Sequence, residues 1–497
     1  MNFQILYKIR QNGNLYLTIL LLLISIHFWV YTHFFPVKYF SDSYIYLELA
    51  KNLSAGKGYY LAENPHQIYS FYPPLYSLFI ALVQLLTGLS SYASVRLVSY
   101  FSLLLFLYLF DKILRFYDLK PVWRLGILLL FWFSSTYVIY LIALSEQIFL
   151  PLFSAHIYAL LKWYKYRKNK YLWRAGLFMG FMLLTRYAAL GLLFSESLWI
   201  LWILYRYKIS YHRIFAFLLP PSIVFGTWYA VLYLNRSLTM GRKLVIHPPN
   251  KFHLKDLIIS ISNWLSPGFT PYFVLPAFVL LAWIMNKNRK QVVVLLHQDD
   301  TWLWLFNFIG YLLFITATVF LFDHTTSYDW RMLLPVYFSF VIMVALLLSK
   351  SFKKRMKKYI GLLLALIFAS HLVFFAQLNI LVEEKNYMKG LETYLQTSYL
   401  YIYTNTPDVF PEYMQKDNHL QSLPFKYDPK STLRNPDYNK QLELMKKRVL
   451  QHKAVIIYFD KHDDRIFLTS PDELNQIFPD IKQKTFSKGI IFENLKE

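Results

Sequence analysis

The feature that most limits the fold of this chain is a succession of apolar runs, each about as long as a membrane is thick. A transmembrane helix needs about 20 predominantly apolar residues, and about 17 suffice in a tight bundle. The chain is 56% hydrophobic and 16% charged, whereas soluble domains carry about 25% charged residues. We therefore predict an α-helical polytopic membrane protein with about 11 transmembrane helices. They are expected near residues 14–35, 92–111, 123–141, 145–162, 173–190, 191–206, 213–234, 269–286, 301–322, 331–349 and 359–380.

Short basic clusters separate these runs and indicate their orientation. Cytoplasmic loops of multi-span proteins carry an excess of Lys and Arg. With a cytoplasmic N-terminus, the predicted spans place all six clusters inside, and these hold 24 of the 35 basic residues before residue 381. The net charge of +23 therefore reflects topology rather than nucleic-acid binding, which needs basic residues on one accessible face. The clusters are Lys8/Arg10, Lys112–Arg124, Lys162–Arg174, Arg206–Arg213, Lys287–Lys290 and Lys350–Lys358.

One step of this topology stays open. The expected spans 173–190 and 191–206 are both short, and a single tilted helix in their place would invert every segment that follows. With two spans, four segments lie on the outer side of the plasma (inner) membrane. They are the loop 36–91, the loop 235–268, the link 323–329 and the tail from residue 381.

The tail differs from the rest of the chain in composition. From residue 381 to the end, 17 basic residues balance 17 acidic ones. We predict two domains: a transmembrane domain over 1–380, and a small soluble α/β domain over 381–497 on the outer face. The elements expected in the tail are strands at 398–405 and 453–460, a helix at 470–478, a strand or hairpin at 485–494 and a loop over 411–440.

The first outer loop carries an acid, Asp42, at the start of "SDSYIYLELAKNL". The apolar spacing of this stretch, with Tyr44 on one side, predicts a short helix lying along the membrane surface. Because Asp is a favoured N-cap residue, a plain helix cap is one reading of Asp42. The stretch "YPPLYSLFIALVQLLTG", which starts at Tyr72, follows and predicts a second juxtamembrane helix.

Ionisable residues at membrane depth are costly, so each needs a partner or a task. Glu146 begins the expected span 145–162, Arg186 lies near the outer end of its span, and Arg331 begins another. A structural bridge between Glu146 and Arg186 is one explanation, and snorkelling is another for Arg331. Together with Asp42, however, these residues are all predicted at one membrane face. Such a cluster suits a lipid-linked sugar phosphate, since arginines bind phosphate and a carboxylate can act as general base.

The order of these segments resembles a known family. It runs from "SDSYIYLELAKNL" through "GKGYY" and "YPPLYSLFIALVQLLTG" to "SEQIFLPLFSAHIYALLKWY" and "GLFMGFMLLTRYAALGLL". It is similar to the GT-C-fold membrane glycosyltransferases, in the bacterial branch related to protein O-mannosyltransferases and the lipid A aminoarabinose transferase. The resemblance covers roughly residues 10–210 and continues faintly through "WRMLLPVY".

This resemblance implies a glycosyltransferase that moves a hexosyl or pentosyl group from a polyprenyl-phosphate donor to an acceptor hydroxyl on the outer face, with inversion. It implies Asp42 as catalytic base, and Arg186 and Arg331 as donor-phosphate ligands. Glu146, Tyr44 and Tyr72 are candidate supporting residues. Many members show two adjacent acids, whereas Ser43 follows Asp42 here. No cofactor is therefore certain, and a divalent metal stays an open alternative that no acid pair supports. There is no cysteine, which excludes thiolate chemistry.

The acceptor implied is an envelope glycan, a lipid or a protein. A different class of function, a transporter or flippase of lipid-linked saccharides, would share the phosphate-binding arginines. It has no need of an acid held in an outer loop, and transporters favour internal repeats and broken helices. We find no convincing internal repeat in this sequence.

Overall fold

The computed structural model describes most of the first 350 residues and parts of the tail. The described residues are 15–34, 41–61, 67–235, 255–261, 279, 282–283, 285–286, 289–321, 328, 330–351, 401–404, 419–424, 438–459, 471–486 and 489–493. The expected span 359–380 and most of 269–286 lie outside these residues. So do the link 323–329, except for Tyr328, and the junction predicted between the two domains.

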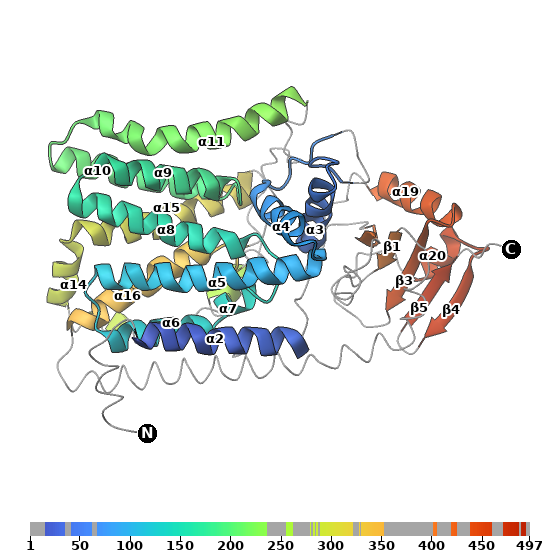
Figure 1. Cartoon of the computed structure of the whole chain (residues 1–497), viewed down its shortest axis with the longest axis horizontal. Coiled ribbons are helices and arrows are strands. Elements are labelled where there is room, and N and C mark those ends of the chain that lie inside the picture. The colour runs from blue at the N-terminus through green and yellow to red at the C-terminus, as the bar shows by residue number, and fades with distance from the viewer. Residues whose placement is uncertain are drawn as a thin grey trace, which may run out of the picture.

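Long apolar helices lie side by side and form a bundle (Figure 1). Among the described residues, five helices are long and apolar enough to cross a membrane, as judged by length and composition. The bundle helices and their bounds are α2 Leu15–Phe34, α5 Ser91–Phe116, α6 Pro121–Trp132, α7 Ser135–Ile139, α8 Glu146–Tyr166, α9 Asn169–Leu183, α10 Ala189–Arg206, α11 Phe215–Leu234, α14 Arg289–Leu296, α15 Asp299–Leu321 and α16 Leu334–Ser351. A short 3₁₀ helix over Tyr211–Ile214 leads into α11. Together with the apolar surface of the bundle, these helices make the chain a multi-pass membrane protein.

The structure answers whether the segment 173–206 forms two helices or one. The segment 173–206 forms two helices, because α9 ends at Leu183 and α10 begins at Ala189 after a turn. Small residues let α9 pack closely against α11: a Cβ atom added at Gly176 would overlap the Phe217 carbonyl, and one at Gly180 would meet Val224. Small residues four apart are a common device for close helix packing in membranes.

One predicted span is wrong as a single helix. The stretch 123–141 forms α6 and the short α7, with a turn at Phe133 and Ser134. The Ser134 side chain caps α7 by accepting a hydrogen bond from the Thr136 backbone N–H. An apolar run does not reveal such a break, because the cap residue satisfies the freed backbone groups without changing the hydropathy.

The connections of the bundle differ at its two ends. The links α5–α6, α8–α9 and α10–α11 lie at one end (Figure 1), and they contain the basic clusters Lys112–Arg124, Lys162–Arg174 and Arg206–Arg213. The juxtamembrane helices α3 (Ser41–Ser54) and α4 (Leu75–Thr87) lie at the opposite end. This separation is what the positive-inside pattern requires.

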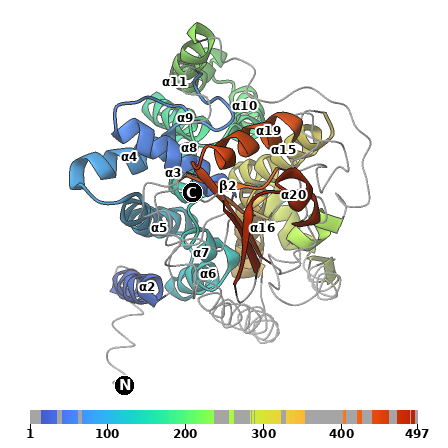
Figure 2. The ribbon, with the colours of Figure 1, turned by 90° about the vertical axis from the view of Figure 1, so that its right-hand side faces the viewer.

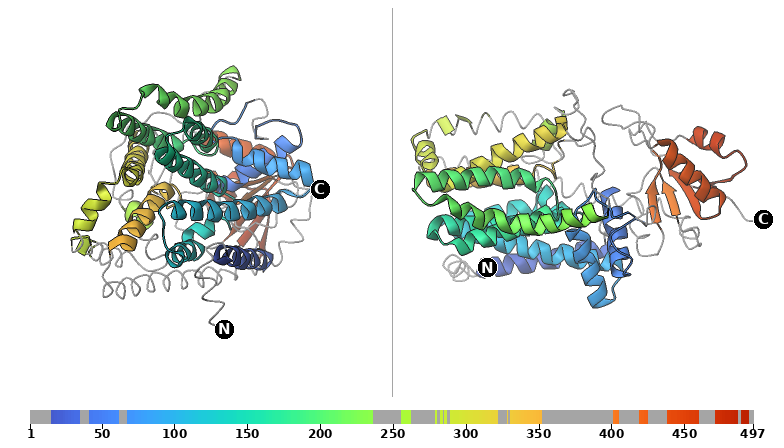
Figure 3. Two further views of the ribbon diagram at one scale, coloured as in Figure 1. Left: turned by 60° about the vertical axis from the view of Figure 1, so that its left-hand side comes forward. Right: turned by 90° about the horizontal axis from the view of Figure 1, so that it is seen from above.

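A five-stranded sheet lies beyond α3 and α4, as Figures 1 and 3 show. Its order is β2-β1-β3-β5-β4, with β1 parallel to β2 and β3, and β5 antiparallel to β3 and β4. The elements are β1 Tyr401–Thr404, β2 His419–Ser422, α19 Tyr438–Leu450, β3 Ala454–Phe459, α20 Pro471–Ile477, β4 Lys482–Phe486 and β5 Gly489–Glu493. The loop predicted over 411–440 is wrong in part, since β2 and the start of α19 fall within it.

Helix α3 is packed between the bundle and the sheet. One hydrophobic cluster joins Tyr44 and Leu47 of α3 with Ile148 of α8 and with Ile402 and Val455 of the sheet. Figure 2 views this end, with the sheet and α19 in front of the helices. Helix α3 is therefore held between two larger bodies, which keeps its acid in a fixed place.

Candidate active site

Asp42 lies in the first turn of α3, where an acid is stabilised by the helix dipole. The helix ends after Ser54, and Gly56 takes a φ of 68° there, in the left-handed region that favours glycine. The Asp42 side chain is 34% exposed, so its carboxylate is accessible at the end of the bundle.

Two residues from distant segments meet the Asp42 carboxylate. The Tyr72 hydroxyl donates a hydrogen bond of 2.8 Å to Asp42 Oδ1. Arg331 Nη1 lies 3.8 Å from Asp42 Oδ2, and the Arg331 side chain is 19% exposed. Burial, followed by the negative charge of Asp42, raises the pKa of Tyr72 well above its usual value of 10.0, so the phenol remains a donor. These contacts reach across the fold, which a plain helix cap does not require.

A second ion pair lies at the same end of the bundle. Glu146, the first residue of α8, is bonded to Arg186 in the turn between α9 and α10. The Glu146 side chain is 3% exposed and the Arg186 side chain 17%, so Arg186 retains an accessible edge. Arg186 also contacts the sulfur of Met332, the neighbour of Arg331. The structure thus brings Asp42, Glu146, Arg186 and Arg331 together, as the sequence predicts.

The two candidate tyrosines have different environments. Tyr72 contacts Asp42 directly, whereas Tyr44 is buried in the hydrophobic cluster between α3 and the sheet. Sequence reasoning missed Tyr46, whose hydroxyl donates to Ser145 Oγ over 3.1 Å. The signal was available, because a residue four positions after Asp42 shares its helix face.

The loop that carries Tyr72 is fixed to the bundle by hydrogen bonds. The Tyr59 hydroxyl donates to the Tyr72 carbonyl over 3.1 Å, and the Tyr187 hydroxyl donates to the Ser70 carbonyl over 2.8 Å. The Leu75 backbone N–H donates to the Leu184 carbonyl over 2.8 Å. These bonds join the segment between α3 and α4 to the turn that carries Arg186.

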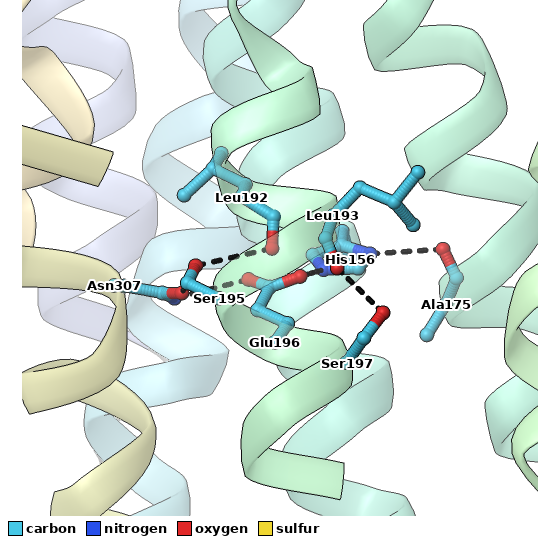
Figure 4. A network of polar contacts seen from close by, with 8 residues as sticks. All are labelled: His156, Ala175, Leu192, Leu193, Ser195, Glu196, Ser197 and Asn307. Atoms are coloured by element: carbon cyan, nitrogen blue, oxygen red, sulfur yellow. Dashed lines mark hydrogen bonds and ion pairs between the residues drawn. The ribbon is translucent and has the colours of Figure 1, made fainter. Parts of the chain in front are cut away.

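A second polar network lies deeper in the bundle (Figure 4). His156 Nε2 of α8 lies 2.5 Å from Glu196 Oε2 of α10, and Asn307 of α15 donates to Glu196 Oε1 over 3.0 Å. His156 Nδ1 lies 2.8 Å from the Ala175 carbonyl of α9. Because a carbonyl only accepts, Nδ1 carries a hydrogen, and one further hydrogen lies between Nε2 and Oε2.

This network and the Glu146–Arg186 ion pair are related by position. Glu146 and His156 are ten residues apart on α8, and Arg186 and Glu196 are ten residues apart along the segment leading into α10. The Glu146–Arg186 pair and the His156–Glu196 pair therefore link the same two segments, at levels about 15 Å apart. His156, Glu196 and Asn307 are fully buried, so this network is not a substrate site. It joins α8 and α10, the helices next to Glu146 and Arg186.

Within the described part of the chain, no group of three or more His, Cys, Asp or Glu side chains is placed to hold a metal ion. The oxygens of Asp42 face Tyr72 and Arg331. What the cluster offers chemically is two carboxylate–guanidinium pairs, Asp42–Arg331 and Glu146–Arg186, that meet through Met332.

The apolar bundle, its two juxtamembrane helices and the sheet define a multi-pass membrane protein with the GT-C fold. The chain is similar to two crystal structures of ArnT, the lipid A aminoarabinose transferase, from Cupriavidus metallidurans. In the apo state the TM-score is 0.60 at 12% identity, over 97% of this chain and 98% of ArnT. In the complex with undecaprenyl phosphate it is 0.58 at 11% identity, over 96% and 97%. The GT-C fold expected from the sequence is confirmed, and the number of 11 transmembrane helices stays a prediction.

The comparison by sequence gives a different result. No protein-family model matches the chain. No curated protein matches it either. The relationship is therefore one of fold, and the chemistry has to be argued from this chain's own residues.

Proposed function

We propose that this protein is a membrane glycosyltransferase that moves a sugar from a polyprenyl-phosphate donor to an acceptor hydroxyl on the outer face of the membrane. The observation that carries the proposal is the convergence of the Asp42 carboxylate with Arg186 and Arg331 at one end of an apolar bundle. ArnT, which shares the fold, is bound to undecaprenyl phosphate in one of its structures.

In the proposed reaction, Asp42 takes the proton of the acceptor hydroxyl. The acceptor oxygen attacks the anomeric carbon, and the bond from that carbon to the phosphate oxygen breaks on the opposite side. The products are an inverted glycoside and polyprenyl phosphate. General-base catalysis of this kind contributes about 10²–10⁴ in rate.

Arg186 and Arg331 hold the phosphate of the donor. Guanidinium groups bind phosphate oxygens in pairs, and charge grows on these oxygens as the sugar leaves. Both side chains keep an exposed fraction, 17% and 19%, through which a lipid phosphate could reach them. Glu146 supports the site by holding Arg186, and Tyr72 supports it by orienting Asp42.

The transporter or flippase reading is less favoured by the same geometry. A flippase has to bind its phosphate on one side of the membrane and release it on the other, but Asp42 and both arginines lie at one end of the bundle. The acceptor, whether envelope glycan, lipid or protein, would approach from that end. We place this end outside the plasma membrane, and the N-terminus in the cytoplasm, because the basic clusters lie at the other end.

The experiment uses the full chain purified in detergent, where transport has no meaning. Polyprenyl-phosphate sugars are added, and sugar transfer or donor hydrolysis is measured by mass spectrometry. We expect Asp42→Asn to lower the rate at least 10²-fold, with thermal unfolding unchanged. Asp472→Asn, at the exposed start of α20, serves as the matched control. A folded Asp42→Asn protein with the wild-type rate contradicts the base assignment.

A further inference from the structure

We propose that Tyr46 is a positioning residue of this site. Its hydroxyl group fixes the Asp42 carboxylate relative to the Arg186 and Arg331 guanidinium groups. The expected effect on kcat rests on the proposed function. The expected effect on the position of α3 rests only on the contacts of that helix.

Tyr46 lies on the same face of α3 as Asp42, one helical turn further along. Its side chain is buried at 4% exposure. Its ring packs against Tyr72, the residue that holds Asp42, with centroids 4.9 Å apart, and against Tyr76 at 5.1 Å. The Ser77 hydroxyl donates to its backbone carbonyl over 3.0 Å. Both the ring and the backbone of Tyr46 are therefore held.

The hydroxyl of Tyr46 is connected by hydrogen bonds to the Glu146–Arg186 ion pair. It donates to Ser145 Oγ over 3.1 Å, and the Ser145 hydroxyl donates to Glu146 Oε2 over 3.3 Å. Glu146 Oε1 faces Arg186. Burial, followed by the charge of Asp42, raises the pKa of Tyr46, which keeps this hydroxyl protonated as a donor.

These contacts close a ring around the site. Arg186 contacts Met332, the preceding residue Arg331 faces Asp42, and Asp42 lies one turn before Tyr46. Helix α3 is therefore joined to the two arginines by two contacts: Asp42 with Arg331, and Tyr46 with Ser145 at the start of α8. The Arg331 contact is long, at 3.8 Å, and partly exposed. The buried hydroxyl bond is the more rigid of the two.

Tyr46→Phe removes one hydroxyl and leaves the packed ring in place. We expect kcat for sugar transfer to fall about tenfold, which corresponds to about 1.4 kcal/mol and is the size of the effect expected from one buried hydrogen bond. We expect KM for the donor to change by less than about twofold, because both arginines remain. Ser145→Ala removes the same link, so the double variant should be no slower than the slower single variant.

Tyr117→Phe is the matched control. Tyr117 is also buried, and its hydroxyl accepts a hydrogen bond of 2.7 Å from Trp304 at the opposite end of the bundle. It therefore loses a comparable bond far from the site. If Tyr117→Phe and Tyr46→Phe lower kcat equally, the effect of Tyr46 is one of general stability and the inference is wrong.

A distance measurement tests the same inference without any turnover. The chain has no cysteine, so spin labels can be attached through Ser54→Cys, at the end of α3, and Tyr166→Cys, at the exposed end of α8. We expect Tyr46→Phe to broaden or shift the α3–α8 distance distribution. An unchanged distribution together with wild-type kcat overturns the inference. Absence of sugar transfer in the wild type counts against the proposed function alone. In that case, the α3–α8 distance distribution of Tyr46→Phe tests whether Tyr46 positions α3.

Discussion

Tyr72 donates a hydrogen bond of 2.8 Å to Asp42, a residue 30 positions earlier in the chain. The bond joins the start of one juxtamembrane helix to the loop before the next. It leaves Asp42 Oδ2 facing Arg331. A carboxylate held in this way has one oxygen fixed and the other directed toward the cationic side of the site, which is the arrangement that the proposed base needs.

Tyr72→Phe should therefore impair the proposed base without removing it. We expect kcat for sugar transfer to fall at least tenfold with the donor KM unchanged, because one hydrogen bond to a charged group contributes about 1.5–3 kcal/mol. Initial rates over a range of donor concentrations measure this. Tyr233→Phe, on the exposed surface of α11, should leave both constants unchanged. A normal kcat in Tyr72→Phe would show that this hydroxyl does not orient the base.

The two arginines should respond differently to substitution. Arg331→Gln removes a partly exposed ion pair, so we expect little loss of stability and at least tenfold weaker binding of undecaprenyl phosphate. Arg186→Gln leaves the buried Glu146 carboxylate without its partner, and should also lower the free energy of unfolding by about 3 kcal/mol. Lipid-phosphate titration and thermal unfolding separate the two effects. Equal destabilisation by both changes would contradict this difference.

The buried network of His156, Glu196 and Asn307 should depend on the hydrogen bonds of residue 196 rather than on its charge. Glu196→Gln keeps an oxygen for Asn307 and supplies an N–H toward His156 Nε2, so we expect stability close to that of the wild type. Glu196→Leu leaves both partners unsatisfied and should lower the free energy of unfolding by about 1–3 kcal/mol for each. Thermal unfolding of the two variants side by side is the measurement. Equal losses would indicate that the carboxylate charge itself is required.

Removal of divalent metal ions should not change the rate. Ser43 follows Asp42 in place of a second acid, and the Asp42 oxygens face Tyr72 and Arg331. We therefore expect sugar transfer to be the same before and after treatment with EDTA. Loss of activity on chelation, with recovery on adding back Mg²⁺, Mn²⁺ or Zn²⁺, would assign a metal to the reaction.

The orientation can be tested with single cysteines. Lys57, just after α3, and Lys168, in the α8–α9 link, are both exposed, and the natural chain has no cysteine. In intact cells, a membrane-impermeant thiol reagent should label Lys57→Cys and not Lys168→Cys. After lysis both should be labelled. The reverse pattern in intact cells would place the candidate site in the cytoplasm.

Local sequence patterns were sufficient for much of the architecture. Apolar runs of spanning length predicted most of the bundle helices, and the residue spacing around Asp42 predicted α3. Hydropathy failed at Ser134, where a capping side chain breaks an apolar run into α6 and α7. The domain junction predicted near residue 380 lies outside the described residues and stays a prediction.

The sequence by itself determined which ionisable residues stand at one end of the bundle: Asp42, Glu146, Arg186 and Arg331. That follows from span boundaries, because burial in lipid excludes charges from most other places. Only the tertiary structure decided which of them pair, that Tyr72 holds Asp42, and that the Tyr46 hydroxyl meets Ser145 at the start of α8. Helical periodicity says which residues share a face, but the neighbour that a face meets depends on packing between segments far apart in the chain.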